Sequence, residues 1–484
     1  MTACLNKTFL IISILAINNS IWAQDSIDVF LNAQMQKRKI PGLQLAIVKE
    51  GKIVKTAHYG LASVQDSIAV TDNTLFTINS ITKAFIGVAI MQLVEQGILH
   101  LSSPISTLLS DLPTAWKAVT IQQLLSHTSG IPDIVDEEEA VLIAATLEDA
   151  WNRVLASPMD FKPGEKFSYN QTNYLLLGRI IDTVSEMPFT RFIIEKQLQK
   201  VAMPHTIRAG FGAEKDVISG AARSYRYSQG KLANLYFSFP PPLQTAAGMS
   251  STATEIATWI IALQSNMFLN KTSLSSLWTP ALLSNGKTGG FSSVLNGYAA
   301  GWPVVSRTEH PAVAPVGGGR SAVFVYPDDN LSVIVLTNLS GGSPDMFIDE
   351  IAGYYIADMK ESNGFGLSAS VKFIRSRLEK FGYKNVVEQV KRIKTTNAFN
   401  LTEKEVNDWG YRLISQNRLT DGLEIFKLNV YLYPASANAF DSLAETYAEL
   451  GDNKLSIVNY EQSLKLDRSN DNAFKQIKKL KAVK

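Results

Sequence analysis

The chain has 484 residues, 46% of them hydrophobic and 19% charged, with 46 Lys and Arg against 44 Asp and Glu. At about 100–200 residues per domain, this length allows two or three domains, and the apolar content excludes a disordered chain. The net charge of +2 excludes nucleic acid as a default partner, because the chain has no strong positive field. The single cysteine, Cys4, excludes a disulfide framework, a cysteine-ligated zinc site and thiol catalysis.

Residues 1–23 have the pattern of a secretory signal peptide. Lys7 precedes a short apolar run at 9–17, and the small residue Ala23 stands at a typical cleavage point. A membrane anchor is the alternative, but it needs roughly 20 apolar residues and this run is about half as long. We therefore expect an exported protein, periplasmic or secreted, with no membrane span in the mature chain.

Residues 28–360 alternate between strand-like and helix-like patterns. Two pairs of strand-like runs, each pair flanking a turn, predict hairpins near the two ends of this region, and helical patterns lie between them. The strand-like runs are 43–48 with 53–57 and 322–326 with 331–336, and the helical patterns include 84–95 and 254–263. Strands at both ends with helices between them predict an α+β domain whose sheet joins distant parts of the chain.

Residues 367–484 contain few strand signals and repeated amphipathic helical patterns. At an offset of 34 residues this region matches itself: Asn438-Ala439-Phe440 recurs as Asn472-Ala473-Phe474. The pattern resembles two or so tetratricopeptide repeats, which would present a surface to a protein partner; the alternative is an ordinary helical bundle. Pro434 agrees with the repeat pattern, whereas Arg468 stands where the second proline would be.

The pattern Ser-x-x-Lys occurs three times, at Ser80–Lys83, Ser228–Lys231 and Ser284–Lys287. The last two contain a glycine and lie in loop-like surroundings, so we interpret them as solvated turns. Ser80 and Lys83 instead open an apolar helix, on which residues i and i+3 share one face. The helix dipole favours negative charge at its N-terminus, and a lysine shielded from water could accept the serine proton. For Ser80 alone, the alternative is a helix N-cap.

Ser80 lies in the first of several motifs. They include Thr77-Ile78-Asn79-Ser80-Ile81-Thr82-Lys83, Leu124-Leu125-Ser126-His127-Thr128-Ser129-Gly130-Ile131-Pro132, Pro163-Gly164-Glu165-Lys166-Phe167-Ser168-Tyr169 and Ala247-Gly248-Met249-Ser250-Ser251-Thr252. In this order they closely resemble the serine β-lactamase/penicillin-binding superfamily, in its class C-like, esterase-containing branch. The resemblance covers residues 28–345.

This resemblance implies a β-lactamase/transpeptidase-like fold for residues 28–360: an antiparallel sheet flanked by helices, with a helical subdomain. The all-α, tetratricopeptide-like module at 367–484 would follow it. In that family Ser80 would be the acylated nucleophile, Lys83 its proton acceptor and Tyr169 a base or proton shuttle. A tyrosine becomes a useful base only where a cation lowers its pKa, and we expect Lys83 to do so.

The sequence departs from the family pattern in two places. Gln171 stands where the second motif has asparagine, so its amide is one methylene longer. Pro315 stands where the third motif has Lys or His, and a proline can neither donate a proton nor bind a carboxylate. Gly317 and Gly318 remain, so a backbone N–H near Gly318 could complete an oxyanion hole with that of Ser80. Arg320 either replaces the missing charge or is a salt-bridged surface arginine.

The histidines do not suggest a metal site. His127, within Leu-Ser-His-Thr-Ser-Gly, is best interpreted as structural, and His58, His100 and His205 show no spacing to partner ligands. The sequence contains no H-E-x-x-H, phosphate loop or dinucleotide fingerprint, so we expect neither a metal nor another cofactor.

Together these observations favour an exported serine hydrolase that forms a Ser80 acyl-enzyme with ester, amide or β-lactam-type substrates, either small molecules or peptidoglycan-like compounds. The loss of the third-motif cation argues against substrates recognised through a carboxylate, and so favours esterase or amidase chemistry. The alternative is a catalytically weakened, penicillin-binding-like ligand-binding or sensor protein whose repeats bind protein partners. Gln171 and Pro315 support that alternative, whereas Ser80, Lys83 and Tyr169 oppose it.

Overall fold

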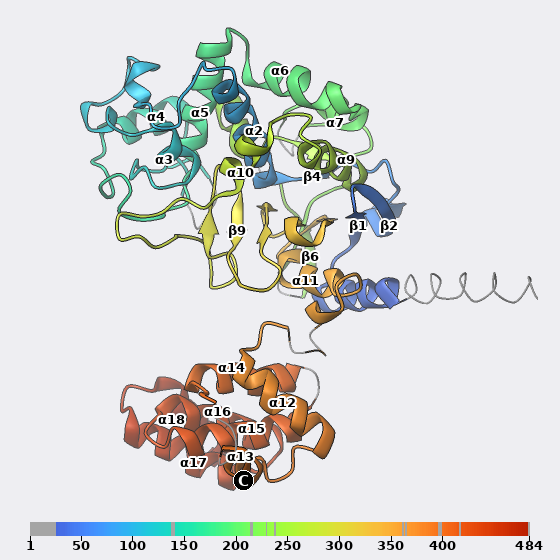
Figure 1. Ribbon diagram of the computed structural model, residues 1–484, viewed down its shortest axis with the longest axis vertical. Helices are drawn as coiled ribbons and strands as arrows, with labels where there is room; N and C mark the ends of the chain where they lie inside the picture. Colours follow the sequence, from blue (N-terminus) through green and yellow to red (C-terminus); the bar gives the residue numbers. More distant parts are fainter. Residues whose placement is uncertain are drawn as a thin grey trace, which may run out of the picture. The chain divides into compact units, whose positions relative to one another are not determined.

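The computed structural model describes residues 26–136, 141–212, 216–228, 230–236, 239–360, 363, 365–394, 399–415 and 418–482. The chain divides into two compact units, of which one ends at Ala357 and the other begins at Asp358 (Figure 1). The predicted signal peptide lies outside the described residues. Within the described ranges, no helix has the length and apolar composition needed to cross a bilayer.

A nine-stranded sheet forms the frame of the first unit. Its strands are β1 (Gly42–Lys49), β2 (Lys52–Ser63), β3 (Ile68–Ala69), β8 (Gly297–Tyr298), β9 (Pro303–Val305), β10 (Ala312–Val313), β11 (Val316–Gly317), β12 (Ser321–Tyr326) and β13 (Leu331–Thr337). Their order is β3-β2-β1-β13-β12-β10-β9-β8, with β11 paired to β12. Both predicted hairpins are present, and they meet where β1 pairs antiparallel with β13, Leu45 opposite Val335. The predicted α+β fold is therefore confirmed.

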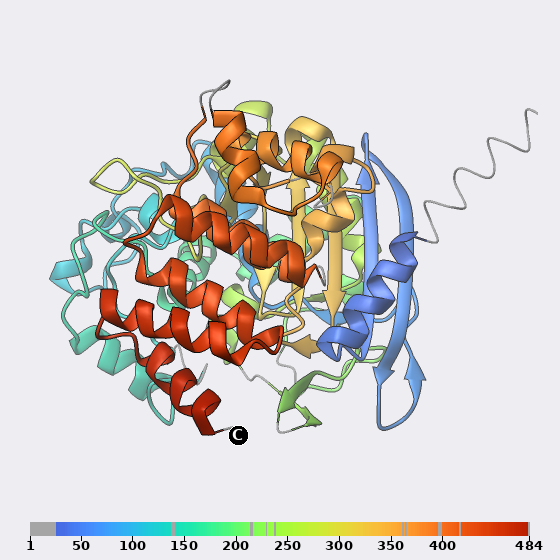
Figure 2. The ribbon, with the colours of Figure 1, turned by 90° about the horizontal axis from the view of Figure 1, so that it is seen from below.

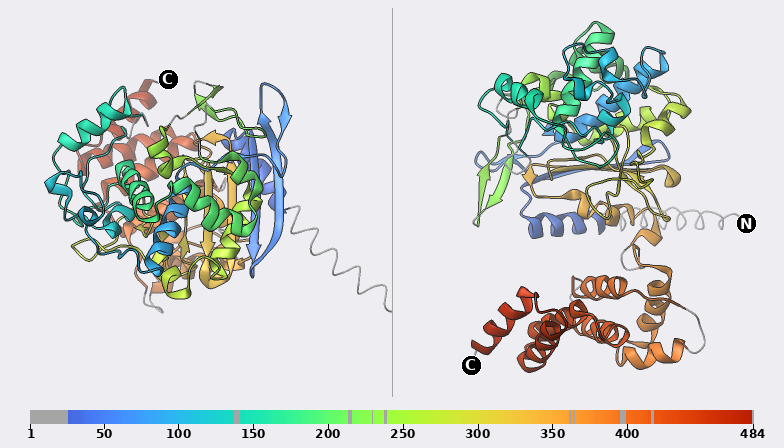
Figure 3. Two further views of the ribbon diagram at one scale, coloured as in Figure 1. Left: turned by 90° about the horizontal axis from the view of Figure 1, so that it is seen from above. Right: turned by 90° about the vertical axis from the view of Figure 1, so that its left-hand side faces the viewer.

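Helices cover both faces of this sheet, which explains why its central strands are continuous apolar runs and not alternating ones. In the right-hand view of Figure 3, the helix at 26–38 (blue) lies on one face and the larger helical subdomain lies on the other. α9 (Ala253–Gln264) packs on β1 and β13, and α11 (Ile348–Ala352) packs on β13. Every residue of β13 is buried as a result.

The helical subdomain surrounds α2 (Thr82–Glu95), whose first twelve residues are all buried. A helix that is apolar on all sides needs neighbours on all sides. The helices that pack against it are α5 (Gln171–Ser185), α6 (Phe189–Ile193), α8 (Gln244–Ala247) and α10 (Lys271–Trp278). The subdomain also contains α3 (Ile121–Leu125), α4 (Leu147–Ala156) and α7 (Pro204–Ala209). Two small sheets complete the unit: β4 (Phe76–Thr77) with β7 (Ser250–Ser251), and β14 (Leu339–Ser340) with β5 (Tyr225–Ser228) and β6 (Lys231–Asn234).

The described part of the second unit is helical. Its helices are α12 (Ala369–Phe381), α13 (Val386–Lys394), α14 (Glu403–Ser415), α15 (Leu419–Leu432), α16 (Ala437–Glu449), α17 (Asn453–Leu466) and α18 (Asp471–Ala482). From α14 onward each helix packs against the next (Figure 2). Pro434 and Arg468 stand at equivalent places, in the turns before α16 and α18. This arrangement is consistent with a repeat module.

Candidate active site

Ser80 lies in a short 3-10 turn, Asn79–Ile81, directly before α2. Asn79 has a φ of +48°, in the left-handed region, so the chain turns sharply just before Ser80. The turn is fixed to β7 and the residue before it, because the Ile78 N–H donates to the Met249 carbonyl at 3.0 Å. Ser80 faces a cavity of about 350 Å³. The local fold thus exposes this one residue at the end of an otherwise buried helix.

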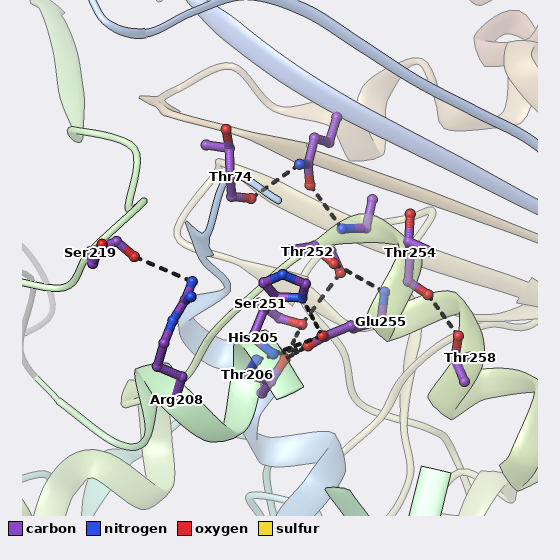
Figure 4. A network of polar contacts seen from close by, with 12 residues as sticks. Thr74, His205, Thr206, Arg208, Ser219, Ser251, Thr252, Thr254, Glu255 and Thr258 are labelled. Carbon is purple, nitrogen blue, oxygen red and sulfur yellow. Dashed lines mark hydrogen bonds and ion pairs between the residues drawn. The ribbon is translucent and has the colours of Figure 1, made fainter. Parts of the chain in front are cut away.

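A buried polar network behind β7 holds this strand, and with it the Ser80 turn, in place (Figure 4). The Ser251 hydroxyl lies 2.7 Å from that of Thr206, which in turn donates to Glu255 Oε2 at 2.5 Å. Glu255 also accepts from the backbone N–H groups of His205 and Thr206, both at 2.8 Å. These bonds join α7 and α9 to the strand next to Ser80. His205 is thereby assigned to a structural contact.

Lys83 is the second residue of α2 and is fully buried. Its Nζ donates to Gln171 Oε1 at 2.9 Å and to the Ala246 carbonyl at 3.0 Å. Burial disfavours the charged form and lowers the pKa of Lys83 to about 7, although the nearby Asp133 opposes this effect. A neutral amine has two N–H groups, which these two bonds use, and a lone pair that can accept a proton. Lys83 is therefore poised to act as a base near neutral pH.

Tyr169 lines the same cavity as Ser80 and Gln171. Burial raises the pKa of Tyr169 well above its ordinary value, and the polar side chains of Ser80 and Gln171 only partly oppose that shift. The expectation that Lys83 lowers this pKa is therefore wrong: desolvation acts on both groups and favours a neutral phenol beside a neutral amine. Tyr169 is suited to relay a proton and not to be the resting base.

Gln171 is the first residue of α5, whose N-cap is Asn170: the Asn170 side chain accepts from the Asn173 N–H at 3.0 Å. From this position the longer amide reaches Lys83, so the extra methylene does not break the contact. His127 supports the same turn, because its Nδ1 accepts from the Asn170 N–H at 3.0 Å. Its ring is fully buried against Tyr169, with centroids 4.4 Å apart, in agreement with a structural role.

Asp133 is a site residue that the sequence analysis missed. It lines the Ser80 cavity, and its Oδ1 accepts from the backbone N–H groups of Gln171 at 2.9 Å and Thr172 at 3.3 Å. Burial raises the pKa of Asp133 to about 6. Its position directly after Gly130-Ile131-Pro132 could have indicated a site residue in the sequence.

The third-motif segment approaches Ser80 through its backbone. A Cβ on Gly317 would lie 2.1 Å from the Ile78 carbonyl oxygen, and one on Gly318 would lie 2.7 Å from Asn79 Nδ2. Gly318, which lines the cavity, also has a φ of +56°, so glycine is required there. Pro315 is buried in the sheet, where its carbonyl accepts from the Val323 N–H at 2.9 Å.

Arg320 is neither at the surface nor at the cavity. Only 1% of it is exposed, and its Nη1 donates to the Ser224 hydroxyl at 2.7 Å. The described cavity lining combines apolar side chains such as Val135 and Phe291 with the carboxyl groups of Asp133 and Asp136, and includes no arginine or lysine. A second cavity of about 460 Å³ shares the lining residues Asn79, Phe239 and Ala247 with the first. Among the described residues, no three His, Cys, Asp or Glu side chains gather as a possible metal site.

Comparison with known proteins identifies this architecture. The Beta-lactamase family model matches residues 27–356, about two thirds of the chain. The chain belongs to the beta-lactamase family. This confirms the resemblance inferred from the motifs, and serine acyl-transfer or hydrolase chemistry is the chemistry of that superfamily.

Individual relatives match parts of the chain. Protein flp of Staphylococcus aureus is 35% identical over 189 residues, which is 38% of each of the two chains. Penicillin-binding protein 4* of Bacillus subtilis is 25% identical over 63% of this chain and 69% of its own. The crystal structure of a penicillin-binding protein from Bacillus halodurans, 27% identical, covers 66% of this chain and 98% of its own with a TM-score of 0.56.

Proposed function

We propose that this protein is a serine hydrolase that forms an acyl-enzyme on Ser80 with ester or amide substrates. The family supports the reaction class, and the site supports the residues. Ser80 and Tyr169 face one cavity, and the buried Lys83 is hydrogen bonded to Gln171 at its edge. A serine, a lysine with a pKa near 7 and a protonated tyrosine are together sufficient for acyl transfer.

In the proposed reaction, Ser80 Oγ attacks the substrate carbonyl carbon while its proton passes through the Tyr169 hydroxyl to the neutral Lys83 amine. The backbone N–H groups of Ser80 and Gly318 stabilise the oxyanion of the tetrahedral intermediate. The bond to the leaving group then breaks, and the leaving group takes the proton back from Lys83. Water attacks the acyl-Ser80 ester through the same relay, releasing a carboxylic acid and restoring Ser80 and Lys83.

The substrates that fit best lack a carboxylate next to the reacting carbonyl. The described lining contains the Asp133 and Asp136 carboxyl groups, and Pro315 offers no charge to pair with an anion. We therefore expect neutral activated esters to be hydrolysed faster than the same esters bearing a carboxylate. A matched pair of such esters, assayed for kcat/KM, tests this preference.

The nucleophile is tested with a fluorescent acylating probe followed by intact-mass analysis. The wild type is expected to gain one acyl group, and Ser80→Ala none. Ser228→Ala and Ser284→Ala are matched controls from the other two Ser-x-x-Lys patterns: Ser228 lies opposite Lys231 in a hairpin, and Ser284 Oγ donates to the Gly164 carbonyl at 3.0 Å. Full labelling of Ser80→Ala would contradict the nucleophile assignment. Equal ester hydrolysis by Ser80→Ala and the wild type, without an adduct, would favour the ligand-binding or sensor alternative.

We also propose that the chain is exported and that its second unit binds a protein partner through tetratricopeptide-like repeats. The signal-peptide pattern supports export, and N-terminal sequencing of the mature protein, expected to begin after Ala23, tests it.

The repeat assignment is supported by two hydrogen bonds between residues about one repeat length apart. Asn438 Nδ2 donates to Glu403 at 2.8 Å, and the Tyr411 hydroxyl donates to Glu445 at 2.6 Å. Cross-linking of the full chain should give a discrete adduct whose linked peptides come from residues 367–484, and an adduct linked only through the first unit would contradict this proposal.

A further inference from the structure

Asp133 joins two motifs that are far apart in the sequence. Its Oδ1 accepts from the N–H groups of Val135, in its own loop, and of Gln171 and Thr172, in the first turn of α5. The same loop and helix are also joined by Thr172 Oγ1, which accepts from the Ile134 N–H and donates to the Pro132 carbonyl, both at 2.9 Å. The Asp133 carboxylate thus lies between the Ser-His-Thr-Ser-Gly loop and the turn that bears Tyr169.

We propose that Asp133 is a positioning residue of the hydrolase: it holds the Tyr169–Gln171 turn against Lys83, and its negative charge controls the protonation of that pair. The proposal rests on the proposed function. Asp133 lines the cavity that Ser80, Tyr169 and Gln171 also line, so its charge faces the same space as their polar groups. It acts through Gln171 and Lys83, without a covalent part in the reaction.

A purely structural cap would not need this charge. α5 already has Asn170 as its N-cap, and an asparagine at position 133 could accept the same N–H groups. A partly buried carboxylate is costly, as the rise of its pKa to about 6 indicates. Its charge raises the pKa of Lys83, against the effect of burial, and disfavours ionisation of Tyr169. Asp133 therefore limits how far burial lowers the pKa of Lys83, and it keeps Tyr169 protonated.

The other buried ionisable groups around Lys83 are aromatic and are held neutral. His127, from the loop after α3, has its pKa lowered by burial and by Lys83. Burial raises the pKa of Tyr174, on α5, and of Tyr298, on β8. Asp136, from the same loop as Asp133, also lines the cavity. Asp133 is the carboxylate identified as acting on both Lys83 and Tyr169.

The test is the pH profile of acylation in Asp133→Asn. Acylation rises with pH as Lys83 loses its proton, and removing a nearby negative charge makes that loss easier. We expect the acidic limb of the profile to shift to lower pH, because losing the Asp133 charge lowers the pKa of Lys83 further. Acylation at the pH optimum should also fall several-fold, because a neutral amide oxygen accepts the same N–H groups less strongly than a carboxylate and holds the turn less firmly.

Two further variants separate charge from packing. Thr172→Val removes the bonds to Ile134 and Pro132 and leaves every charge in place, so it should slow acylation without moving the acidic limb. Asp133→Glu keeps the charge on a longer side chain and should behave in the same way, even if Asp133→Asn folds poorly. An acidic limb that stays in place in a folded Asp133→Asn protein, or that moves equally in Thr172→Val, overturns the proposal. Absence of Ser80-dependent labelling in the wild type would instead overturn the proposed function.

Discussion

The two sides of the catalytic cavity have kept different parts of the family pattern. On the side-chain side (Ser80, Lys83, Tyr169 and Gln171), the one altered residue, Gln171, still accepts a hydrogen bond from Lys83 at 2.9 Å. On the backbone side, Gly318 lines the cavity and follows Pro315 and Gly317. The charged group is absent there, but the chain approaches Ile78 and Asn79 so closely that only glycine fits. The comparison supports the proposal that this chain keeps the groups needed for carbonyl attack and lacks the charge that would recognise a carboxylate.

Lys83→Met tests the side-chain side and has the largest expected effect. Methionine fills a similar volume without a basic amine, so the rate of acyl-probe labelling should fall by about 10²- to 10⁴-fold, the usual contribution of a general base. Lys231→Met, in the hairpin with Ser228, is the matched control and should label at the wild-type rate. Labelling of Lys83→Met at that rate would show that another group accepts the Ser80 proton.

The same substitution should stabilise the protein. The pKa of Lys83 is about 7 in the folded chain and about 10.4 in an unfolded one, so the unfolded state binds more protons between these values. The wild-type free energy of unfolding should therefore rise as pH increases from 7 toward 10, by a few kcal/mol, at about 1.4 kcal/mol per pKa unit. Lys83→Met should be more stable at pH 7 and should lack this part of the rise. Denaturant unfolding at both pH values measures it.

Much of the fold and part of the site could be predicted because the signals are local. The two hairpins follow from apolar runs around turn residues, and α2 follows from a continuous apolar stretch after Ser80. The role of Asp133 could not be predicted from such patterns, because its partner Gln171 lies 38 residues away. The burial of individual side chains could not be predicted either. Arg320 follows three glycines, as in a surface loop, yet only 1% of it is exposed.

The prediction that Lys83 lowers the pKa of Tyr169 was wrong for a related reason. The sequence places a lysine near the tyrosine but does not say how much water surrounds the pair. In the folded protein Lys83 and Tyr169 are both buried, and desolvation moves each toward its neutral form. Which residues meet could be inferred from motifs, whereas the protonation states required the packing around them.

Gly318→Ala tests the backbone side. A Cβ there would lie 2.7 Å from Asn79 Nδ2, so the turn before Ser80 must move, and a shift of about 1 Å at a catalytic site can cost on the order of 100-fold in rate. Gly286→Ala is the matched control, because Gly286 also has a positive φ, +77°, but has no atom within 4 Å of the added Cβ. Gly286→Ala should introduce the same backbone strain without slowing acylation. Equal effects of the two substitutions on kcat/KM would contradict the view that the close approach of Gly318 to Asn79 matters for the rate.

Pro315→Lys would restore the missing charge and sharpen the comparison between the two sides. A charge-assisted hydrogen bond contributes roughly 1.5–3 kcal/mol, so kcat/KM for a carboxylate-bearing ester should rise by about tenfold or more. The neutral ester should change little. Pro315→Ala, which removes the proline without adding a charge, separates the effect of the cation from that of the backbone. A gain in Pro315→Ala equal to that in Pro315→Lys would contradict the charge argument.

Gln171→Asn has the smallest expected effect, and it decides whether the altered second motif is a defect or an adjustment. The shorter amide would withdraw from Lys83 and weaken one hydrogen bond, which is worth about 0.5–1.5 kcal/mol. We therefore expect acylation to slow by about 2- to 10-fold, although the substitution restores the residue of the family motif. Gln171→Leu, with no amide at all, should be slower still. A faster Gln171→Asn enzyme would mean that glutamine weakens catalysis here, which is what the ligand-binding hypothesis requires of this position.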